Sequence, residues 1–184
     1  HHIGSSHFDK YRQQINQVGF RLFYYHPFDK DKSVWDFLKN DKSITVIHLT
    51  RNNMLRTLAS QKIGSKTKIW TQKDGDVQPV SVVTKQISLS KQECLDFFKE
   101  TCQYEEEINK VFNDRNLVKV NYEELTEHST STTNYIFEKL SVPTHQSTSN
   151  RKKQNPEPLA ELITNYAVLK AAFKGSEFEV FFES

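Results

Sequence analysis

The segment from residue 44 to residue 63 constrains the fold most, because a strand pattern passes directly into a helix pattern there. Residues 44–49 read ITVIHL, a run of β-branched and apolar side chains that predicts a buried central strand. From Asn53 onward apolar residues recur at helical spacing, which predicts a helix that ends at Gly64. A buried strand followed at once by an amphipathic helix is typical of α/β proteins.

The remaining segments continue this alternation of strands and helices. Strand character recurs in residues 20–25 (FRLFYY) and 117–122 (LVKVNY). Helices are predicted over 33–38, 90–112, 131–140 and from Asn155 onward, with a capping box formed by Ser90 and Glu93. Residues 65–79 are predicted to be a loop, and the aromatic tail at 178–182 to pack back on the core. The order predicts a single α/β domain over residues 1–184, in which helices flank a central, mainly parallel sheet.

Composition narrows the class of protein. With 36% hydrophobic and 26% charged residues, the chain is expected to be globular, and a net charge of +2 is too small to indicate a nucleic-acid-binding protein. Cys94 and Cys102 lie about 12 Å apart along one predicted helix, too far for a disulfide, which suits a reducing compartment. No membrane-spanning run or signal peptide is visible, so we expect a cytoplasmic protein.

Three polar side chains follow the predicted strand at intervals that suit an anion. A helix begins just after Arg51, and the free N–H groups at its start favour a negative charge. Asn52, Arg56 and Ser60 follow four residues apart and therefore share one helix face. Two cations and a hydroxyl beside a helix start suit a bound phosphate. The alternative is an ordinary solvated face of a surface helix.

This strand–Arg–Asn–helix–Ser order resembles the 3′-phosphate motif of sulfotransferases that use 3′-phosphoadenosine-5′-phosphosulfate (PAPS). The resemblance implies a P-loop-NTPase-like fold, PAPS as sulfuryl donor, adenosine 3′,5′-bisphosphate (PAP) as product, and a 3′-phosphate held by Arg51 and Ser60, with Arg56 beside them. The family pattern has Arg-Asn-Pro with Ser eight positions after Arg. Here the segment reads Arg-Asn-Asn, and Ser60 stands nine positions after Arg51.

Two histidines compete for the role of general base. Residues 19–28 (GFRLFYYHPF) resemble the family strand that ends in a catalytic His, which implies His26 as the base that accepts the acceptor's proton. The alternative is a semi-exposed residue at a strand end. The family often has Lys two positions earlier, where this chain has Tyr24. His48 lies inside the predicted central strand, and we expect it to be a buried sheet residue.

A late basic segment completes the predicted donor site. Residues 150–155 read NRKKQN, and the resemblance implies that Arg151, Lys152, Lys153 and Gln154 close over the 3′-phosphate. A solvated run of charges is the alternative. Residues 120–125 (VNYEEL) resemble a family segment whose Tyr122 and Glu123 brace the sheet end. Residues 62–70 (KIGSKTKIW) resemble the segment after the Arg motif, and Lys66, Lys68 and Trp70 within them are candidates to line the acceptor site, with a flexible basic loop as the alternative.

The family's N-terminal loop for the 5′-phosphosulfate is not visible, so the fold is expected to lack its first βα unit. Residues 1–7 (HHIGSSH) are set aside as a tag remnant or the edge of a missing segment. The predicted function is transfer of a sulfuryl group from PAPS to a hydroxyl or amine of a small-molecule, glycan or lipid acceptor, without a metal, since no ligand spacing is present. The alternative is a non-catalytic PAP-binding or protein-interaction module. A P-loop kinase is disfavoured because no Walker A lysine is present.

Overall fold

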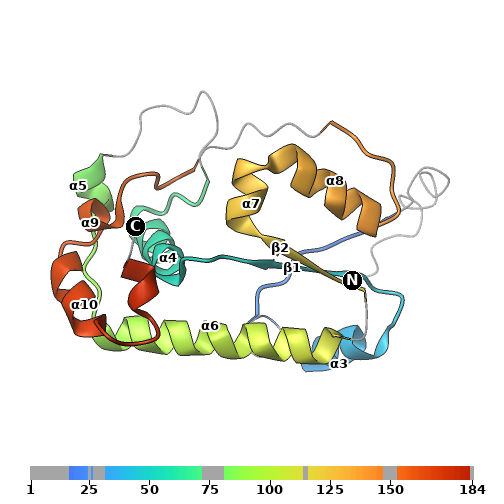
Figure 1. Ribbon diagram of the computed structural model, residues 1–184, viewed down its shortest axis with the longest axis horizontal. Helices are drawn as coiled ribbons and strands as arrows, with labels where there is room; N and C mark the ends of the chain where they lie inside the picture. The colour runs from blue at the N-terminus through green and yellow to red at the C-terminus, as the bar shows by residue number, and fades with distance from the viewer. Residues whose placement is uncertain are drawn as a thin grey trace.

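The computed structural model describes residues 17–24, 26, 32–71, 81–113, 116–146 and 153–182. Eleven elements are named within these ranges, and they alternate along the chain as an α/β protein requires (Figure 1). In order they are α3 (Lys32–Asn40), β1 (Val46–Thr50), α4 (Met54–Thr67), α5 (Val82–Lys85), α6 (Lys91–Phe112), β2 (Leu117–Asn121), α7 (Tyr122–Glu127), α8 (Ser129–Lys139), α9 (Leu159–Leu162), α10 (Tyr166–Phe173) and the 3₁₀ helix η1 (Glu179–Phe182).

The sheet of the described residues consists of two parallel strands. β1 pairs with β2 in a register that runs from Val46 opposite Leu117 to Thr50 opposite Asn121. Figure 1 shows α7 and α8 on one side of this sheet and the long α6 on the other. The prediction of a parallel α/β arrangement flanked by helices is therefore confirmed at this level. The P-loop-like architecture remains a prediction.

The predicted strand and helix at residues 44–63 both form, with two differences. Leu49 of β1 is 49% exposed, so the strand is not buried on both faces as predicted. α4 continues past Gly64 to Thr67, so the predicted helix end is wrong. Gly64 is buried inside the helix, where an added Cβ would lie 2.8 Å from the ring of Trp70. The helix ends instead at Lys68, whose left-handed backbone donates to the Gly64 carbonyl oxygen.

The main core joins α4 and the first half of α6 to the C-terminal segment. Phe98 of α6 is fully buried, and its ring lies 5.8, 5.3 and 4.9 Å from those of Phe173, Phe178 and Phe181. The prediction that the aromatic tail packs back is thus confirmed. The Ser90–Glu93 capping box is also present at the start of α6.

Two other predictions are wrong. The helix expected from Asn155 onward is instead two short helices, because Ile163 is extended and pairs with Ile87 in an isolated parallel bridge. Residues 20–24 form no strand, and Phe20 is 68% exposed, while Tyr25 lies outside the described residues. In the part of the chain that the structure describes, no helix has the length and apolarity needed to cross a bilayer.

Candidate functional site

The candidate site lies where β1 passes into α4, at the carboxyl end of the sheet. Asn53 has extended backbone and caps α4, since its Oδ1 accepts from the Arg56 N–H at 2.9 Å. Its Nδ2 donates to the carbonyl oxygen of Phe181, 3.1 Å away in η1. The start of α4 is therefore fixed both by its own cap and by the C-terminal tail. Carboxyl ends of parallel strands are where open α/β sheets build ligand sites.

Arg51 emerges at this junction and is held by two groups that follow β2. Its guanidinium lies over the ring of Tyr122, with 4.3 Å between Cζ and the ring centroid. Its Nε lies 3.6 Å from Oε1 of Glu123, which makes an ion pair but not a hydrogen bond. The Arg51 side chain is 26% exposed, yet its Nε is buried and has no hydrogen-bond partner among the described residues.

The turn after β1 is also fixed from the end of β2. Oε2 of Glu123 accepts from the Asn52 N–H at 3.1 Å, and Nδ2 of Asn121 donates to Oδ1 of Asn52 at 2.6 Å. These contacts confirm that Tyr122 and Glu123 brace this end of the sheet. Asn121 was not singled out from the sequence. The signal that identifies it is its position at the end of a strand predicted to be parallel to the one before Arg51.

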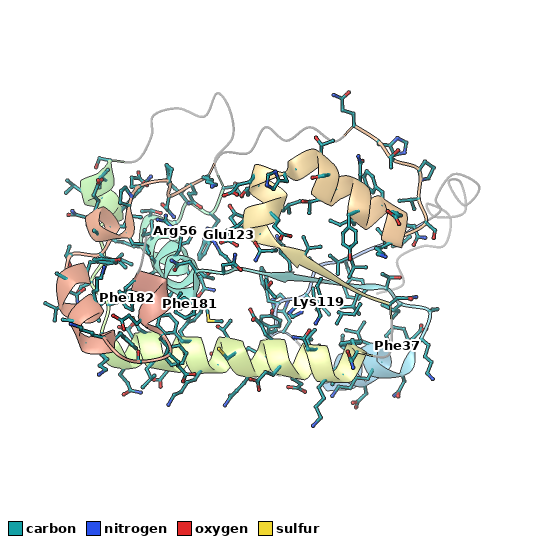
Figure 2. The ribbon with its side chains drawn as sticks, viewed as in Figure 1. Phe37, Arg56, Lys119, Glu123, Phe181 and Phe182 are labelled. Carbon is teal, nitrogen blue, oxygen red and sulfur yellow. The ribbon has the colours of Figure 1, made fainter. Side chains whose placement is uncertain are left out.

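Arg56 and Ser60, one turn apart on α4, meet a segment from the far end of the chain. Nη1 of Arg56 donates to the carbonyl oxygens of Asn155 and Glu157 at 3.0 and 3.1 Å. Nδ2 of Asn155 lies 3.3 Å from Oγ of Ser60. In Figure 2, Arg56 is labelled on α4 and Glu123 on α7, close to where both helices leave the sheet.

Part of the late basic segment, residues 153 and 154, therefore lies in the region of Arg56 and Ser60, as predicted. Gln154 is half-buried, and its side-chain Nε2 donates to the carbonyl oxygen of Ile69 in the segment after α4. Lys153 is exposed beside it. Arg151 and Lys152 lie outside the described residues. The structure thus brings Arg56, Ser60 and Gln154 to one region, and it leaves the position of the other two cations open.

A buried ion pair supports this segment from behind. Nζ of Lys85, the last residue of α5, donates to Oε1 of Glu157 at 2.7 Å and to the carbonyl oxygen of Gln154 at 2.9 Å. The side chains of Lys85 and Glu157 are only 7% and 18% exposed. Neither residue was predicted as part of the site. A single Lys at the end of a four-residue helix carries no sequence signal that distinguishes it from a surface charge.

The two arginines of the site are close enough to affect each other. Burial, then the positive charge of Arg51, lower the pKa of Arg56 from its ordinary value, while Glu157 and Tyr166 act in the opposite direction. The Glu123 carboxylate, 3.6 Å away, partly offsets the charge of Arg51, whereas the acceptors bound to Nη1 of Arg56 are neutral carbonyls, so positive charge remains at this junction. Such an arrangement favours an anionic ligand.

The two candidate histidines differ in their surroundings. His26 is exposed and has helical backbone, and its N–H donates to the Phe23 carbonyl oxygen at 3.1 Å, so it does not follow a strand as predicted. His48 is buried in β1, as expected, and its Nε2 lies 2.8 Å from the hydroxyl of Tyr24. Burial and the charge of Lys119 lower the pKa of His48. Burial and the charge of Glu105 raise the pKa of Tyr24.

The fold and the site together define an α/β protein in which two arginines lie at the end of a parallel strand pair. Among the described residues, no group of three or more His, Cys, Asp or Glu side chains is arranged to hold a metal ion. The sequence is 28% identical over 180 residues to Nodulation protein H of Rhizobium tropici, and the match covers 94% of this chain and 68% of that protein. This similarity supports a relationship to the sulfotransferases. No protein-family model and no solved structure match the sequence.

Proposed function

We propose that this protein is a sulfotransferase that moves a sulfuryl group from PAPS to an acceptor hydroxyl or amine. The observation that carries the proposal is the convergence of Arg56 and Ser60 with the segment 155–157, about a hundred residues further along the chain, beside Arg51, whose charge acts on Arg56. Arg56 contacts residues 99 and 101 positions away. Only the fold can bring these residues together. The guanidinium, ammonium and hydroxyl groups among them are the kinds of side chain that bind phosphate.

The donor end of the proposed site consists of the cations and the hydroxyl of this junction. Arg51 and Ser60 hold the 3′-phosphate of PAPS, and Arg56, Lys153 and Gln154 surround it, with Arg151 and Lys152 as further cations. The buried Nε of Arg51 supports this role, because a buried donor without a partner costs about 1–3 kcal/mol. A phosphate oxygen placed there satisfies that donor and reduces the repulsion between Arg51 and Arg56.

The proposed reaction needs few chemical groups from the protein. The acceptor oxygen or nitrogen attacks sulfur, the bond between sulfur and the bridging phosphate oxygen breaks, and PAP leaves with the electron pair. The acceptor's proton passes to a base, for which we propose His26. Negative charge builds on the 5′-phosphate of PAP as the bond to sulfur breaks, while the cations of this junction act on the 3′-phosphate and hold the donor in position for the attack. The acceptor is a small molecule, glycan or lipid that bears the hydroxyl or amine.

The test is binding of PAP, measured by isothermal titration calorimetry, to the wild-type protein and to Arg51→Ala. We expect wild type to bind and the variant to lose at least tenfold in affinity, since an arginine–phosphate pair is charge-assisted and bidentate. His26→Ala serves as the comparison, because it should retain PAP affinity and lose transfer of radiolabelled sulfate. If Arg51→Ala binds PAP as well as wild type, the site assignment is wrong. If His26→Ala keeps full transfer activity, His26 is not the base.

A further inference from the structure

The buried pair of Lys85 and Glu157 lies next to the proposed donor site, and the proposed chemistry does not use it. We propose that these two residues are positioning residues that hold segment 154–157 against α4 and α5, so that Lys153 and Gln154 face the 3′-phosphate. This inference rests on the proposed function. It assigns to Lys85 a role in donor affinity although its ammonium group is directed at protein atoms rather than at the ligand.

The burial of this pair separates it from an ordinary surface contact. Lys62 and Glu93 form the comparison, since they lie 2.6 Å apart but are 45% and 43% exposed. Exposed pairs contribute about 0–1 kcal/mol, whereas removing one partner of a buried pair costs about 3–5 kcal/mol. A buried pair is poor evidence of net stability, because desolvation offsets the attraction. What it fixes is one arrangement of the chain, here that of residues 154 and 157.

The contacts along the segment show what this arrangement achieves. The carbonyl oxygens of Gln154, Asn155 and Glu157 accept from Lys85 or from Arg56. Three dipoles whose negative ends would repel a phosphate are thus bound to protein cations. Oε1 of the Glu157 carboxylate is likewise bound by Lys85, whereas its Oε2 is buried without a hydrogen-bond partner among the described residues. The segment therefore lies against α4 with the carbonyl oxygens of residues 154, 155 and 157 bound to cations, and under the proposal the neighbouring side chains of Lys153 and Gln154 face the phosphate.

Contacts beyond Lys85 keep the following helices in place independently of the pair. The Ile87 N–H donates to the Leu162 carbonyl oxygen, and the Thr164 N–H donates to that of Ile87, both at 2.8 Å. Asn165 bonds both the N–H and the carbonyl oxygen of Leu89. Loss of Lys85 should therefore release residues 153–157 while α9 and α10 stay docked. If the competent arrangement falls to about a tenth of the population, the apparent Kd for PAP rises about tenfold.

The experiment titrates PAP into wild type, Lys85→Met and the control Lys62→Met, and it follows hydrogen exchange of residues 153–163 in the same proteins. A merely structural defect lowers the fraction of active molecules, which appears as a reduced binding stoichiometry at unchanged Kd. Loss of positioning raises Kd at full stoichiometry. We expect Lys85→Met to show the roughly tenfold rise, with faster exchange at 153–157 and unchanged exchange at 159–163, while Lys62→Met behaves as wild type.

A second variant guards against misfolding of the first. Replacing both partners, Lys85→Met with Glu157→Leu, leaves no uncompensated buried charge, so its stability should recover. Its Kd for PAP should remain raised, because the donor to the Gln154 carbonyl oxygen is still missing. A wild-type Kd in both variants, or a change in stoichiometry alone, overturns the inference and leaves the proposed function standing. Failure of the wild type to bind PAP refutes the proposed function, and the positioning role falls with it.

Discussion

Replacement of Arg56 by Met tests whether this residue holds the fold together as well as the ligand. The structure gives Nη1 of Arg56 two acceptors, the carbonyl oxygens of Asn155 and Glu157. Met matches the Arg side chain as far as Nε, but it lacks the guanidinium group and donates no hydrogen bond. The variant therefore removes the link between α4 and segment 154–157.

The expected size of the effect follows from those two bonds. A hydrogen bond to a charged donor contributes about 1.5–3 kcal/mol, and two that share one nitrogen fall short of twice that value. Relief of the repulsion from Arg51 acts in the opposite direction. Because Arg56 is half-buried, we take the lower end and expect the free energy of unfolding to fall by about 2 kcal/mol, without any ligand present.

The assay is urea unfolding of the ligand-free protein, with Arg51→Met as the matched control. Arg51 contacts only the Tyr122 ring and, at 3.6 Å, the carboxylate of Glu123 among the described residues, so its replacement should cost less than about 1 kcal/mol. The two substitutions should thus have different effects: Arg56→Met lowers stability, whereas Arg51→Met lowers PAP affinity. Equal stabilities for wild type and Arg56→Met, within about 0.5 kcal/mol, refute the stabilising role of the Nη1 hydrogen bonds.

Three further perturbations test other parts of the structure. Phe98→Ala should lower the free energy of unfolding in urea by about 3–5 kcal/mol, because the ring is fully buried among three others, and a loss under about 1 kcal/mol would contradict this packing. Lys68→Gly should increase the free energy of unfolding by up to about 1 kcal/mol and so raise the melting temperature. The reason is that Lys68 ends α4 with a φ of 60°, a left-handed conformation that glycine adopts without strain. The lowered pKa of His48 means that the folded state holds its proton more weakly than the unfolded chain does. Stability should therefore fall as pH drops below 6.5, and His48→Gln should flatten that slope in urea titrations at about pH 5 and pH 7.

Local signals in the sequence suffice for the elements that carry the site. The β-branched run at residues 44–49 and the helical spacing of apolar residues after Asn53 predict β1 and α4, because strand propensity and amphipathic periodicity act within a few residues. The capping box at Ser90 predicts the start of α6 for the same reason. The positions of Arg56 and Ser60 on one face of α4 follow from helical geometry alone, whereas Arg51 precedes the helix.

Non-local pairing explains where the sequence fails. Residues 159–173 have helical periodicity, but pairing of Ile163 with Ile87 interrupts the helix, and no local signal records a partner 76 residues away. Residues 20–24 have strand composition but no strand to pair with among the described residues, so Tyr24 instead packs against Tyr104 and His48. The roles of Lys85 and Glu157 are equally invisible, since they exist only once two distant segments meet.

The same reasoning explains why a chain with a net charge of only +2 can offer an anion site. Two arginines and Lys85 are concentrated at one end of the sheet, and each is held by a different kind of group: an aromatic ring, backbone carbonyls and a carboxylate. Among these three cations, only Lys85 has a carboxylate within hydrogen-bonding distance, that of Glu157 at 2.7 Å. The carboxylate of Glu123 lies 3.6 Å from Arg51. Arg51 thus has one ion pair, with Glu123 at 3.6 Å, and Arg56 is held by carbonyls that carry no net charge, so an anion can bind this preorganised positive charge without first breaking a hydrogen-bonded ion pair of either arginine.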